Sequence, residues 1–428
     1  MSGNLPESPY TERAAPAPDT PALKGETKAE VCVVGGGFTG LSAALRLAEK
    51  GVDTVLLEAE EPGFGASGRN GGQIIPGFKH DPDAMIARFG EDKGEALAAF
   101  AGGAPDLVFE LIERHEIDCD AVRSGWLQAA HGSAALPAVE SRVRQWRARG
   151  APIELLGAEE TERLTGARGY AGALLDARGG TLNPLAFARG LARAALSEGA
   201  RLHGGSPVTS LREEGGGWRV STGQGGVRAE RVLIATNAYT GDFWPGLAQS
   251  VIPVYSYQIA TEPLSANLQA TIMPNRLGLS DTRRLLNYCR QDAGGRLLVG
   301  GRGYRRESSD PDDFQGIRRA LGRLFPAVGD VPLRYCWSGR VALTLDHWPH
   351  IGELAPGLSI AYGFNGRGVA MATATGRQMA EHLSGAPLER LPLPVRPFKP
   401  LRGHGYLPQL LAAAIGVKKL QDWWEMRR

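Results

Sequence analysis

The chain has 428 residues, 43% of them hydrophobic and 22% charged, so it can bury a sizeable core and is expected to form two domains. Its 48 basic and 46 acidic residues leave a formal net charge of +2, which gives no electrostatic basis for binding nucleic acid. The four cysteines are scattered without a CxxC pair, which argues against a disulfide framework or a cysteine zinc site, and we expect no metal centre.

The sequence also argues against a membrane protein. No apolar run approaches the roughly 20 residues that a transmembrane helix needs. The amino terminus lacks the basic and then apolar pattern of a signal peptide. We therefore expect a cytoplasmic protein without a transmembrane segment.

The first half of the chain predicts an arm followed by α/β units. Residues 1–27 are rich in proline, acidic and small residues, which favour an extended arm on the surface over a helix. A short apolar strand at 30–34, a glycine turn, an amphipathic helix and a second strand at 54–58 follow. Beyond them the pattern predicts helices over 83–89, 135–150 and 184–200, and strands within 124–130, 200–211, 218–223 and 231–236.

The second half is richer in strands. Residues 251–340 predict an antiparallel sheet, with strands at 251–261, 296–302 and 334–343. A last strand at 358–363, a glycine-rich turn and a helix at 369–385 return to the α/β pattern. A proline-rich stretch then leads to a helical segment that ends at 418–428.

The first turn has the spacing of a nucleotide-binding site. Gly35, Gly37 and Gly40 form GxGxxG between a strand and a helix, and Glu58 closes the next strand. The glycines allow the backbone to approach a pyrophosphate, and the helix N-terminus offers free N–H groups. Glu58 suits the ribose hydroxyls and would repel the ribose phosphate of NADP, so FAD or NAD is the expected dinucleotide. The alternative is a purely structural turn, which the order of strand, turn, helix, strand and acidic residue disfavours.

Residues 65–73, "GASGRNGGQ", distinguish between these two cofactors, and we call this segment the glycine strip. It contains four glycines and no apolar residue larger than alanine. Its backbone amides can approach a phosphate or a flavin without a collision of side chains. Because FAD needs its ring held in addition to its ADP half, the strip favours FAD.

Several segments in the same order resemble the D-amino-acid oxidase superfamily of FAD-dependent oxidoreductases, and within it the gamma-glutamylputrescine oxidase group. The segments are "PALKGETKAEVCVVGGGFTGLSAALRLAEKG", "GASGRNGGQ", "GGTLNPLAFARGLARAA", "LIATNAYT", "HWPHIGE" and "YGFNGRGVAMATATG". The resemblance implies an α/β fold: a Rossmann-like FAD-binding domain with an inserted α+β substrate domain on an antiparallel sheet. The expected parts are an extended arm (1–27), the FAD-binding domain (28–80, 160–250 and 340–395), the substrate domain (81–159 and 251–339) and a C-terminal segment with a helix (396–428).

The resemblance also implies which residues hold FAD. The ADP half would be bound by Gly35, Gly37, Phe38, Thr39, Gly40, Glu58 and Ala59, and adenine would meet the backbone of Val208. The pyrophosphate and ring would lie along Ser67, Arg69, Asn70, Gly71, Gly72 and Gln73, with Ala235, Thr236 and Asn237 beside the cofactor. The turn and helix start at Gly363, Gly366, Arg367, Gly368 and Val369 would face the pyrimidine edge of the flavin, where a cation stabilises the negative charge of the reduced form. Arg367 as a solvated surface residue is the alternative.

The implied reaction is oxidation of an amine to an imine, which water hydrolyses to a carbonyl compound, with oxygen reduced to hydrogen peroxide. Gamma-glutamylputrescine or a related amine is the expected substrate. One alternative is an FAD-dependent oxidase of D-amino, proline-like or N-methyl amino acids, or a dehydrogenase of the same substrates that passes its electrons to another acceptor. A more remote alternative is a non-catalytic flavin-binding subunit. Substrate identity, oligomeric state and the acceptor are left open by the sequence.

Two departures from related oxidases point away from small α-amino acids. Pro76 stands where sarcosine-oxidase-like members carry a carboxylate-binding arginine, and Arg340 is shifted by one residue from the arginine of a Gly-x-Arg-Pro sequence. A shift of one residue turns a strand side chain to the opposite face. A buried carboxylate without a cation is costly, so we expect an amine, or a long amine with a distant carboxylate.

Expected substrate-pocket residues are Tyr255 or Tyr257, Tyr288, Arg290 and Trp337, with Arg367 at the flavin, although tyrosines in strands are as often plain packing. Alternation places Tyr255 and Tyr257 on one face, and Tyr288 and Arg290 on a face opposite Cys289. The resemblance to sarcosine-oxidase-like relatives implies a substrate-domain lysine near the flavin, but no lysine lies between Lys93 and Lys399, so oxygen activation would need another cation, such as Lys79, Arg69 or Arg367. Cys336 lies three residues from the slot at which some relatives attach flavin, so non-covalent FAD is expected.

Overall fold

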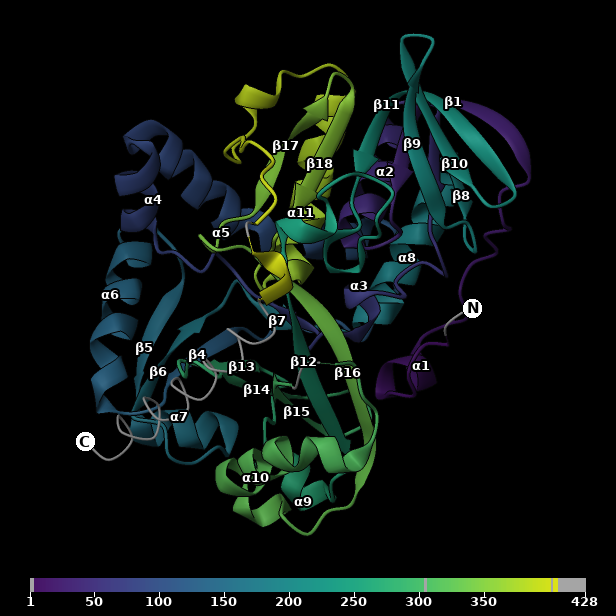
Figure 1. Ribbon diagram of the computed structural model, residues 1–428. Helices are drawn as coiled ribbons and strands as arrows, with labels where there is room; N and C mark the ends of the chain where they lie inside the picture. Colours follow the sequence, from purple (N-terminus) through teal and green to yellow (C-terminus); the bar gives the residue numbers. More distant parts are fainter. Residues whose placement is uncertain (1–3, 304–305, 402, 407–428) are drawn as a thin grey trace.

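Two eight-stranded sheets form the framework of the protein (Figure 1). The computed structural model describes residues 4–303, 306–401 and 403–406. In the first sheet the order is β17-β18-β11-β1-β2-β8, with β10 paired to β11 and β9 to β10. Its strands are β1 (Gly25–Val34), β2 (Thr54–Leu57), β8 (Arg201–His203), β9 (Val208–Glu214), β10 (Gly217–Thr222), β11 (Gly225–Ile234), β17 (His350–Ala355) and β18 (Leu358–Tyr362).

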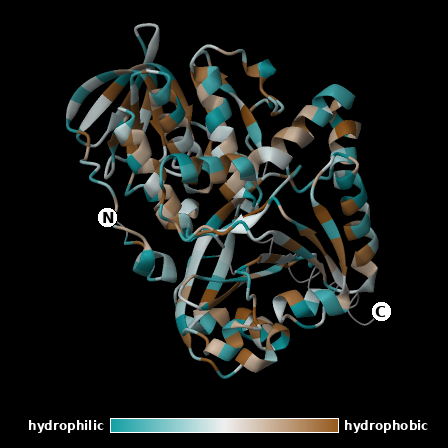
Figure 2. Cartoon of the chain, turned by 180° about the vertical axis from the view of Figure 1, so that it is seen from behind, coloured by the Kyte–Doolittle hydropathy of each residue, from teal (hydrophilic) through white to brown (hydrophobic). Residues whose placement is uncertain are grey.

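The central strands of the first sheet run parallel, as expected for α/β units. β1 pairs in parallel with β11 and β2, β2 with β8, and β11 with β18. Parallel strands are buried on both faces and therefore read as continuous apolar runs. Every residue of β2 and β18 is buried accordingly. Figure 2 shows apolar residues, in brown, in strands as well as in helices of the molecule.

Helices pack together beside this sheet. They are α2 (Phe38–Glu49), α5 (Glu91–Arg114), α8 (Pro184–Ser197) and α11 (Gly368–Leu383). α2 contacts α8 and α11, and α11 contacts α5. The start of α8 is encoded locally, because the Asn183 side chain accepts hydrogen bonds from the amides of Leu185 and Ala186 and Pro184 occupies the first turn.

The second sheet has the order β16-β12-β15-β14-β13-β4-β6-β5. Its neighbours are antiparallel except for β13 and β4, which run parallel. The strands are β4 (Trp126–Ala130), β5 (Ile153–Gly157), β6 (Gly172–Asp176), β12 (Ile252–Thr261), β13 (Gly278–Asp281), β14 (Asn287–Gln291), β15 (Leu297–Arg302) and β16 (Leu333–Leu343). The sheet predicted over 251–340 is therefore wider, since three strands come from residues before 180. One of them, β6, falls in the stretch 160–250 that we expected beside the first sheet.

The remaining elements complete the second domain and the junction. Ile317, Leu321 and Leu324 of α10 share an apolar cluster with Tyr257 and Cys289 of the second sheet. A two-stranded pair, β3 with β7, lies in the connection between the sheets. The elements are α3 (Ala66–Arg69), α4 (Pro82–Phe89), α6 (Leu136–Arg147), α7 (Ala158–Thr165), α9 (Ala266–Gln269), α10 (Gln315–Leu324), β3 (Gln73–Ile74) and β7 (Gly180–Thr181).

The N-terminal arm differs from the extended surface segment that its composition predicted. It contains a short helix, α1 (Pro9–Arg13), and Tyr10 is only 1% exposed. Ser8 and Thr11 form a capping box around the helix start, and Pro9 favours the first helical position. The prediction was wrong here because it relied on the high content of proline and polar residues and overlooked the local capping signal.

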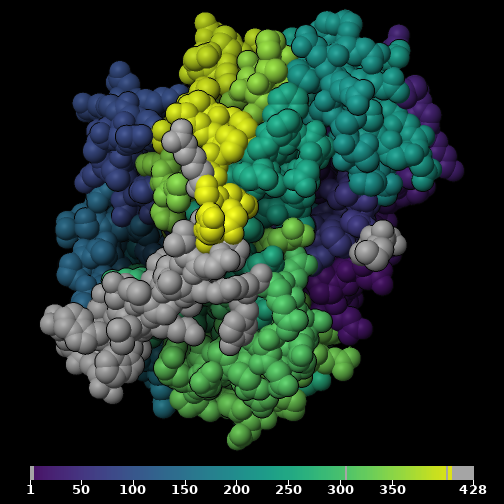
Figure 3. Space-filling model, viewed as in Figure 1, coloured from purple at the N-terminus to yellow at the C-terminus, as the bar shows by residue number. Residues whose placement is uncertain are grey.

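The C-terminal part of the described chain returns to the first sheet region. The Leu401 amide donates a hydrogen bond to the Gln249 carbonyl, and His404 contacts the Val251 carbonyl. Figure 3 shows these yellow residues on the surface beside teal and green segments. The helix expected at 418–428 lies outside the described residues. None of the helices described combines the length and apolar character needed to cross a membrane.

The contact between α2 and α11 gives a test of the packing. A Cβ atom at Gly376 would collide with the carbonyl oxygen of Thr39 and lie 2.9 Å from the Ser42 Cβ. We expect Gly376→Ala to push the helices apart and to destabilise the protein by about 1–3 kcal/mol. Gly103→Ala in α5 is the matched control, because nothing lies within 4 Å of a Cβ there and alanine favours a helix. Thermal unfolding should show a lower midpoint for Gly376→Ala and an equal or higher midpoint for Gly103→Ala; equal midpoints for both variants would contradict the close helix contact.

Candidate active site

A cavity of about 830 Å³ lies between the two sheets and is lined by residues of both. Its volume is in the range of sites for cofactors and drug-sized ligands. Among the residues described, no group of three or more His, Cys, Asp or Glu side chains is arranged to hold a metal ion. The chemistry of the cavity therefore has to be understood from its backbone, its aromatic side chains and its cations.

The GxGxxG turn forms the first wall of the cavity. Gly35 has a φ of +109°, and a Cβ there would lie 3.0 Å from the backbone of Ala235. A Cβ at Gly40 would collide with the Gly35 carbonyl oxygen. Both positions therefore require glycine, and the N-terminus of α2 opens toward the cavity at Gly37, Phe38 and Thr39.

Glu58 fixes the loop that follows β2. Its carboxylate accepts hydrogen bonds from the Gly36 amide at 2.6 Å and from the Glu60 amide at 3.1 Å. Burial raises the pKa of Glu58, while these backbone amides act in the opposite direction. Each carboxylate oxygen keeps a further lone pair, so Glu58 can still accept a hydrogen bond from a hydroxyl in the cavity. Ala59 and Val208 line the cavity near it.

The glycine strip connects the turn with the second sheet. The Ser67 Oγ accepts a hydrogen bond from the Phe38 amide at 2.9 Å, and the Asn70 Oδ1 accepts one from the Gly72 amide at 2.8 Å. Gln73 donates to the carbonyls of Leu279 at 2.9 Å and Cys289 at 3.1 Å. Ser67, Asn70, Gly71 and Gln73 line the cavity, whereas Arg69 and Gly72 do not.

Arg69 has a structural position instead. Its Nε donates to the Phe64 carbonyl at 2.8 Å, and its guanidinium carbon lies 4.6 Å from the Phe64 ring centroid. A nitrogen of Arg69 lies 3.4 Å from the Glu307 carboxylate. The side chain is thus held within the protein, although the sequence suggested that it would contact a ligand directly.

A second helix N-terminus faces the cavity at α11. Gly366, Arg367, Gly368 and Val369 line it, and nothing lies within 4 Å of a Cβ placed at Gly366 or Gly368. Arg367 is 7% exposed and donates to the Pro76 carbonyl at 2.7 Å, so the solvated alternative is excluded. Burial lowers the pKa of Arg367 to about 9, with a further contribution from Arg142. Gly363 lies outside the lining but positions the turn, since its amide donates to Asn237 at 3.0 Å.

The structure brings together Ala235, Thr236 and Asn237 with the two helix N-termini. A turn that needs glycine at two positions, two helix starts and an acidic residue after β2 fit an extended dinucleotide with a pyrophosphate. The far end of the cavity extends over β12, β13, β14 and β15, which leaves room for a ring system beyond the ADP half. The residues present therefore fit FAD.

The residues expected in the substrate pocket are only partly there. Tyr255 and Tyr288 line the cavity, and the Tyr288 hydroxyl lies 2.7 Å from the Ser256 hydroxyl. Tyr257 lies in the apolar cluster below the sheet, where its ring stacks on Phe314 at 4.6 Å and its hydroxyl donates to the Arg306 carbonyl. Tyr257 was expected to contact the substrate. The cavity is instead lined by Tyr255, which lies two residues nearer the start of β12.

Trp337 and Arg290 also lie away from the cavity. Trp337 is fully buried and donates to the Arg69 carbonyl at 3.1 Å. Arg290 is 2% exposed and donates to the Gly71 carbonyl at 2.8 Å. Both side chains hold the glycine strip from behind and do not face the cavity, because the strip lies between them and the open space. Tyr288 lies on the same face of the second sheet as Trp337 and Arg290. Cys289 lies on the opposite face, in the apolar cluster that contains Tyr257.

Sequence reasoning missed many residues that line the cavity, among them three polar ones on the second sheet. Ser256, Gln128 and Arg302 come from β12, β4 and β15. Alternation along β15 would have placed Arg302 on the same face as Gly300, over which the Tyr288 ring lies. The position of Arg302 at the cavity could therefore have been predicted if β14 and β15 had been known to be neighbours.

Comparisons with known proteins agree with this geometry. Residues 30–382 match the DAO family, described as FAD dependent oxidoreductase. A gamma-glutamylputrescine oxidoreductase of Escherichia coli is 39% identical over 359 residues, which are 83% of this chain and 84% of that protein. A probable oxidoreductase of Haemophilus influenzae is 35% identical over 404 residues, which are 93% and 92% of the two chains.

A solved structure confirms the expected fold class. The crystal structure of glycine oxidase from Geobacillus kaustophilus matches with a TM-score of 0.73 at 23% identity, covering 88% of this chain and 99% of that chain. The framework is thus a Rossmann-like FAD-binding fold that carries a substrate domain on the second sheet. The resemblance seen in the sequence is confirmed, and the chain belongs to the DAO family of FAD-dependent oxidoreductases.

Proposed function

We propose that this enzyme oxidises the carbon–nitrogen bond of an amine whose carboxylate lies away from the oxidised carbon, as in gamma-glutamylputrescine. The observation that carries the proposal concerns Arg302, which lines the cavity on the side of the second sheet. This cation has no acidic partner among the described residues. The similarity to a gamma-glutamylputrescine oxidoreductase over most of both chains supports the same class of substrate.

FAD, when bound, supplies the two-electron acceptor for this reaction. The chain's own residues bind and orient. The helix starts and the GxGxxG turn suit the pyrophosphate, and the strip residues Ser67, Asn70, Gly71 and Gln73 suit the ring. Tyr288 and Tyr255 provide aromatic walls along which an aliphatic amine would align while water is excluded.

Pro76 and Arg340 occupy or adjoin the two positions at which related oxidases bind the carboxylate of a small amino acid, and neither supplies an arginine that is available for it. Pro76 offers a carbonyl that already accepts a hydrogen bond from Arg367. Arg340 lines the cavity, but its Nε donates to Glu307 at 2.9 Å and its guanidinium carbon lies 4.2 Å from the Tyr239 ring centroid. Its charge is therefore balanced within the protein. Both observations support a substrate other than a small α-amino acid.

Arg302, which belongs to β15 of the second sheet, is available for an acidic group. Arg283, which also lines the cavity, pairs with Asp281. Burial lowers the pKa of Arg302, which means that its charge lacks both full hydration and a described counter-ion. A carboxylate in the cavity would relieve that cost with a charge-assisted hydrogen bond.

We also propose that FAD is held without a covalent bond and that oxygen accepts the electrons. Cys336 does not line the cavity, and burial raises the pKa of its thiol, which supports non-covalent binding. The amine loses two electrons and two protons to form the imine, and water converts the imine to an aldehyde and ammonia. Oxygen takes up two electrons and two protons and leaves as hydrogen peroxide.

The proposed substrate class is tested by anaerobic mixing of the purified FAD-loaded enzyme with amines, observed through the flavin absorbance. N-(4-aminobutyl)glutaramic acid should bleach the flavin, and its neutral primary amide should require a higher concentration. Arg302→Met should raise the half-saturating concentration of the acid about tenfold and leave that of the amide unchanged, since one charged hydrogen bond is lost.

The matched control is Arg168→Met, which removes an exposed arginine that pairs with Glu162 outside the cavity. It should leave both substrates unaffected, and Arg302→Lys should retain part of the preference for the acid. Bleaching by amino acids alone would contradict the proposed substrate class. Equal effects of Arg302→Met on acid and amide would instead contradict only the role of Arg302.

Lys79 gives the active site a pH dependence. The Lys79 side chain is exposed and lines the cavity, where desolvation by the surrounding protein, with Arg367 and Arg142 nearby, lowers its pKa to about 8, and no carboxylate in the described part of the chain pairs with it. The ammonium group is charged below this pH and neutral above it. We expect the visible spectrum of bound FAD to change between pH 6.5 and 9 with a midpoint near 8. Lys79→Met should abolish this transition.

Lys50→Met serves as its control, because Lys50 pairs with Glu381 and does not line the cavity. This variant should titrate as the unmodified enzyme does. A transition that persists in Lys79→Met would assign the titration to another group.

A further inference from the structure

We propose that the N-terminal arm is part of the flavin site, because Tyr10 is a positioning residue for the glycine strip and acts through Trp337 and Arg290. This inference rests on the proposed placement of the flavin ring over the strip. It adds to that placement a segment that lies before the first strand of the Rossmann unit and does not line the cavity.

Tyr10 is buried against both residues that hold the strip. Its ring centroid lies 5.4 Å from that of Trp337, with an angle of 79° between the rings. The guanidinium carbon of Arg290 lies 5.6 Å from the Tyr10 centroid. An edge-to-face pair and a buried cation over a ring face are both attractive arrangements. Tyr10 thus contacts two side chains that approach the strip from the same side.

The next contacts reach the strip itself. Trp337 donates to the Arg69 carbonyl at 3.1 Å, and Arg290 donates to the Gly71 carbonyl at 2.8 Å. Gly71 lines the cavity, and a Cβ there would lie 2.7 Å from the Tyr288 ring. One hydrogen bond therefore separates Arg290 from the cavity wall at Gly71, and one separates Trp337 from the backbone of Arg69, whose neighbour Asn70 lines the cavity. A shift of the Trp337 or Arg290 side chain would move that wall.

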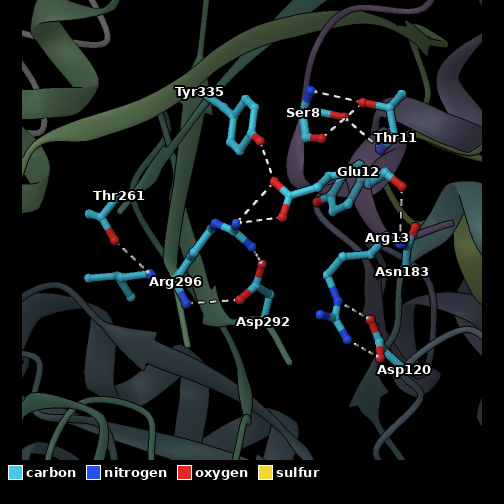
Figure 4. A network of polar contacts seen from close by, with 12 residues as sticks. Ser8, Thr11, Glu12, Arg13, Asp120, Asn183, Thr261, Asp292, Arg296 and Tyr335 are labelled. Carbon is cyan, nitrogen blue, oxygen red and sulfur yellow. Dashed lines mark hydrogen bonds and ion pairs between the residues drawn. The ribbon is translucent and has the colours of Figure 1, made fainter. Parts of the chain in front are cut away.

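The arm is held in place from both domains (Figure 4). On the substrate side, Glu12 pairs with Arg296 at 2.7 Å and accepts a hydrogen bond from Tyr335. On the other side, Asn183, which caps α8, donates to the Tyr10 carbonyl at 3.3 Å, and Arg13 pairs with Asp120, in the segment between α5 and β4, at 2.9 Å. Tyr10 itself clusters with Leu185 of α8 and with Ala260 and Leu298 of the second sheet. Its ring is consequently fixed relative to both sheets.

The test uses the full-length protein with Tyr10 replaced by leucine or phenylalanine. The hydroxyl of Tyr10 makes no hydrogen bond to the described residues, so phenylalanine keeps the contacts that matter. We expect Tyr10→Leu to raise the dissociation constant for FAD about tenfold, because the edge-to-face and cation contacts are lost. The visible circular dichroism of the bound flavin should change with it, and Tyr10→Phe should leave both quantities within twofold of the original.

The matched control is Glu12→Gln on the same helix, which weakens the ion pair of the arm with Arg296 but keeps the Tyr10 ring. It should change the flavin signals much less than Tyr10→Leu does, because the contacts of Arg13, Asn183 and the apolar cluster still hold the Tyr10 ring. An unaltered FAD affinity and visible spectrum in Tyr10→Leu would overturn the proposal. Equal changes in Glu12→Gln and Tyr10→Leu would overturn it as well, since they would show a general effect of arm docking.

A second variant keeps the test valid if Tyr10→Leu does not fold by far-ultraviolet circular dichroism. Trp337→Phe retains an aromatic ring beside Tyr10 but loses the N–H that bonds the Arg69 carbonyl. It should alter the visible circular dichroism of bound FAD in the same direction, and an unaltered spectrum would refute the proposed path. These readouts need no amine, so a failure of the proposed substrate chemistry leaves them unaffected.

Discussion

The carbonyl oxygens of Arg69 and Gly71 face the second sheet, where Trp337, Gln258 and Arg290 donate hydrogen bonds to them. The rest of the active site depends on these bonds, because the glycine strip has no large apolar side chain with which to anchor itself. A buried carbonyl left without a donor costs about 1–3 kcal/mol. The strip therefore has one favourable position relative to the second sheet, and this position sets the width of the cavity.

Charge is distributed unevenly around the same cavity. Arg69 and Arg340 share Glu307, and Arg283 pairs with Asp281. Lys79 and Arg302 have no such counter-ion among the described residues, and desolvation by the surrounding protein lowers the pKa of both, although the Lys79 side chain is exposed to the cavity. Cations that are partly desolvated and unpaired favour anionic ligands. This physical property links the binding of a negatively charged cofactor with the proposed preference for an amine that carries an acid.

The strip, the arm and the second sheet form one support. Gln73 bonds the backbones of β13 and β14, and Tyr10 packs behind the donors from β14 and β16. Contacts between segments that are far apart in the sequence therefore determine the geometry at the cavity wall. Because protein interiors are closely packed, a change in any one of them is transmitted to the others.

From the sequence alone, the resemblance of several segments in order indicated the family and its fold class, and local periodicity with the glycines at Gly35 and Gly40, which no other residue can replace, indicated the GxGxxG turn. The sequence also located the α11 turn and the strip. It did not distinguish side chains that face the cavity from side chains that hold its wall. Trp337 and Arg290 have the same strand pattern as Tyr288, and only the position of the strip against the sheet separates their roles. The place of Tyr10 and the unpaired charge of Arg302 likewise depend on contacts across the domains, which alternation along a single strand does not contain.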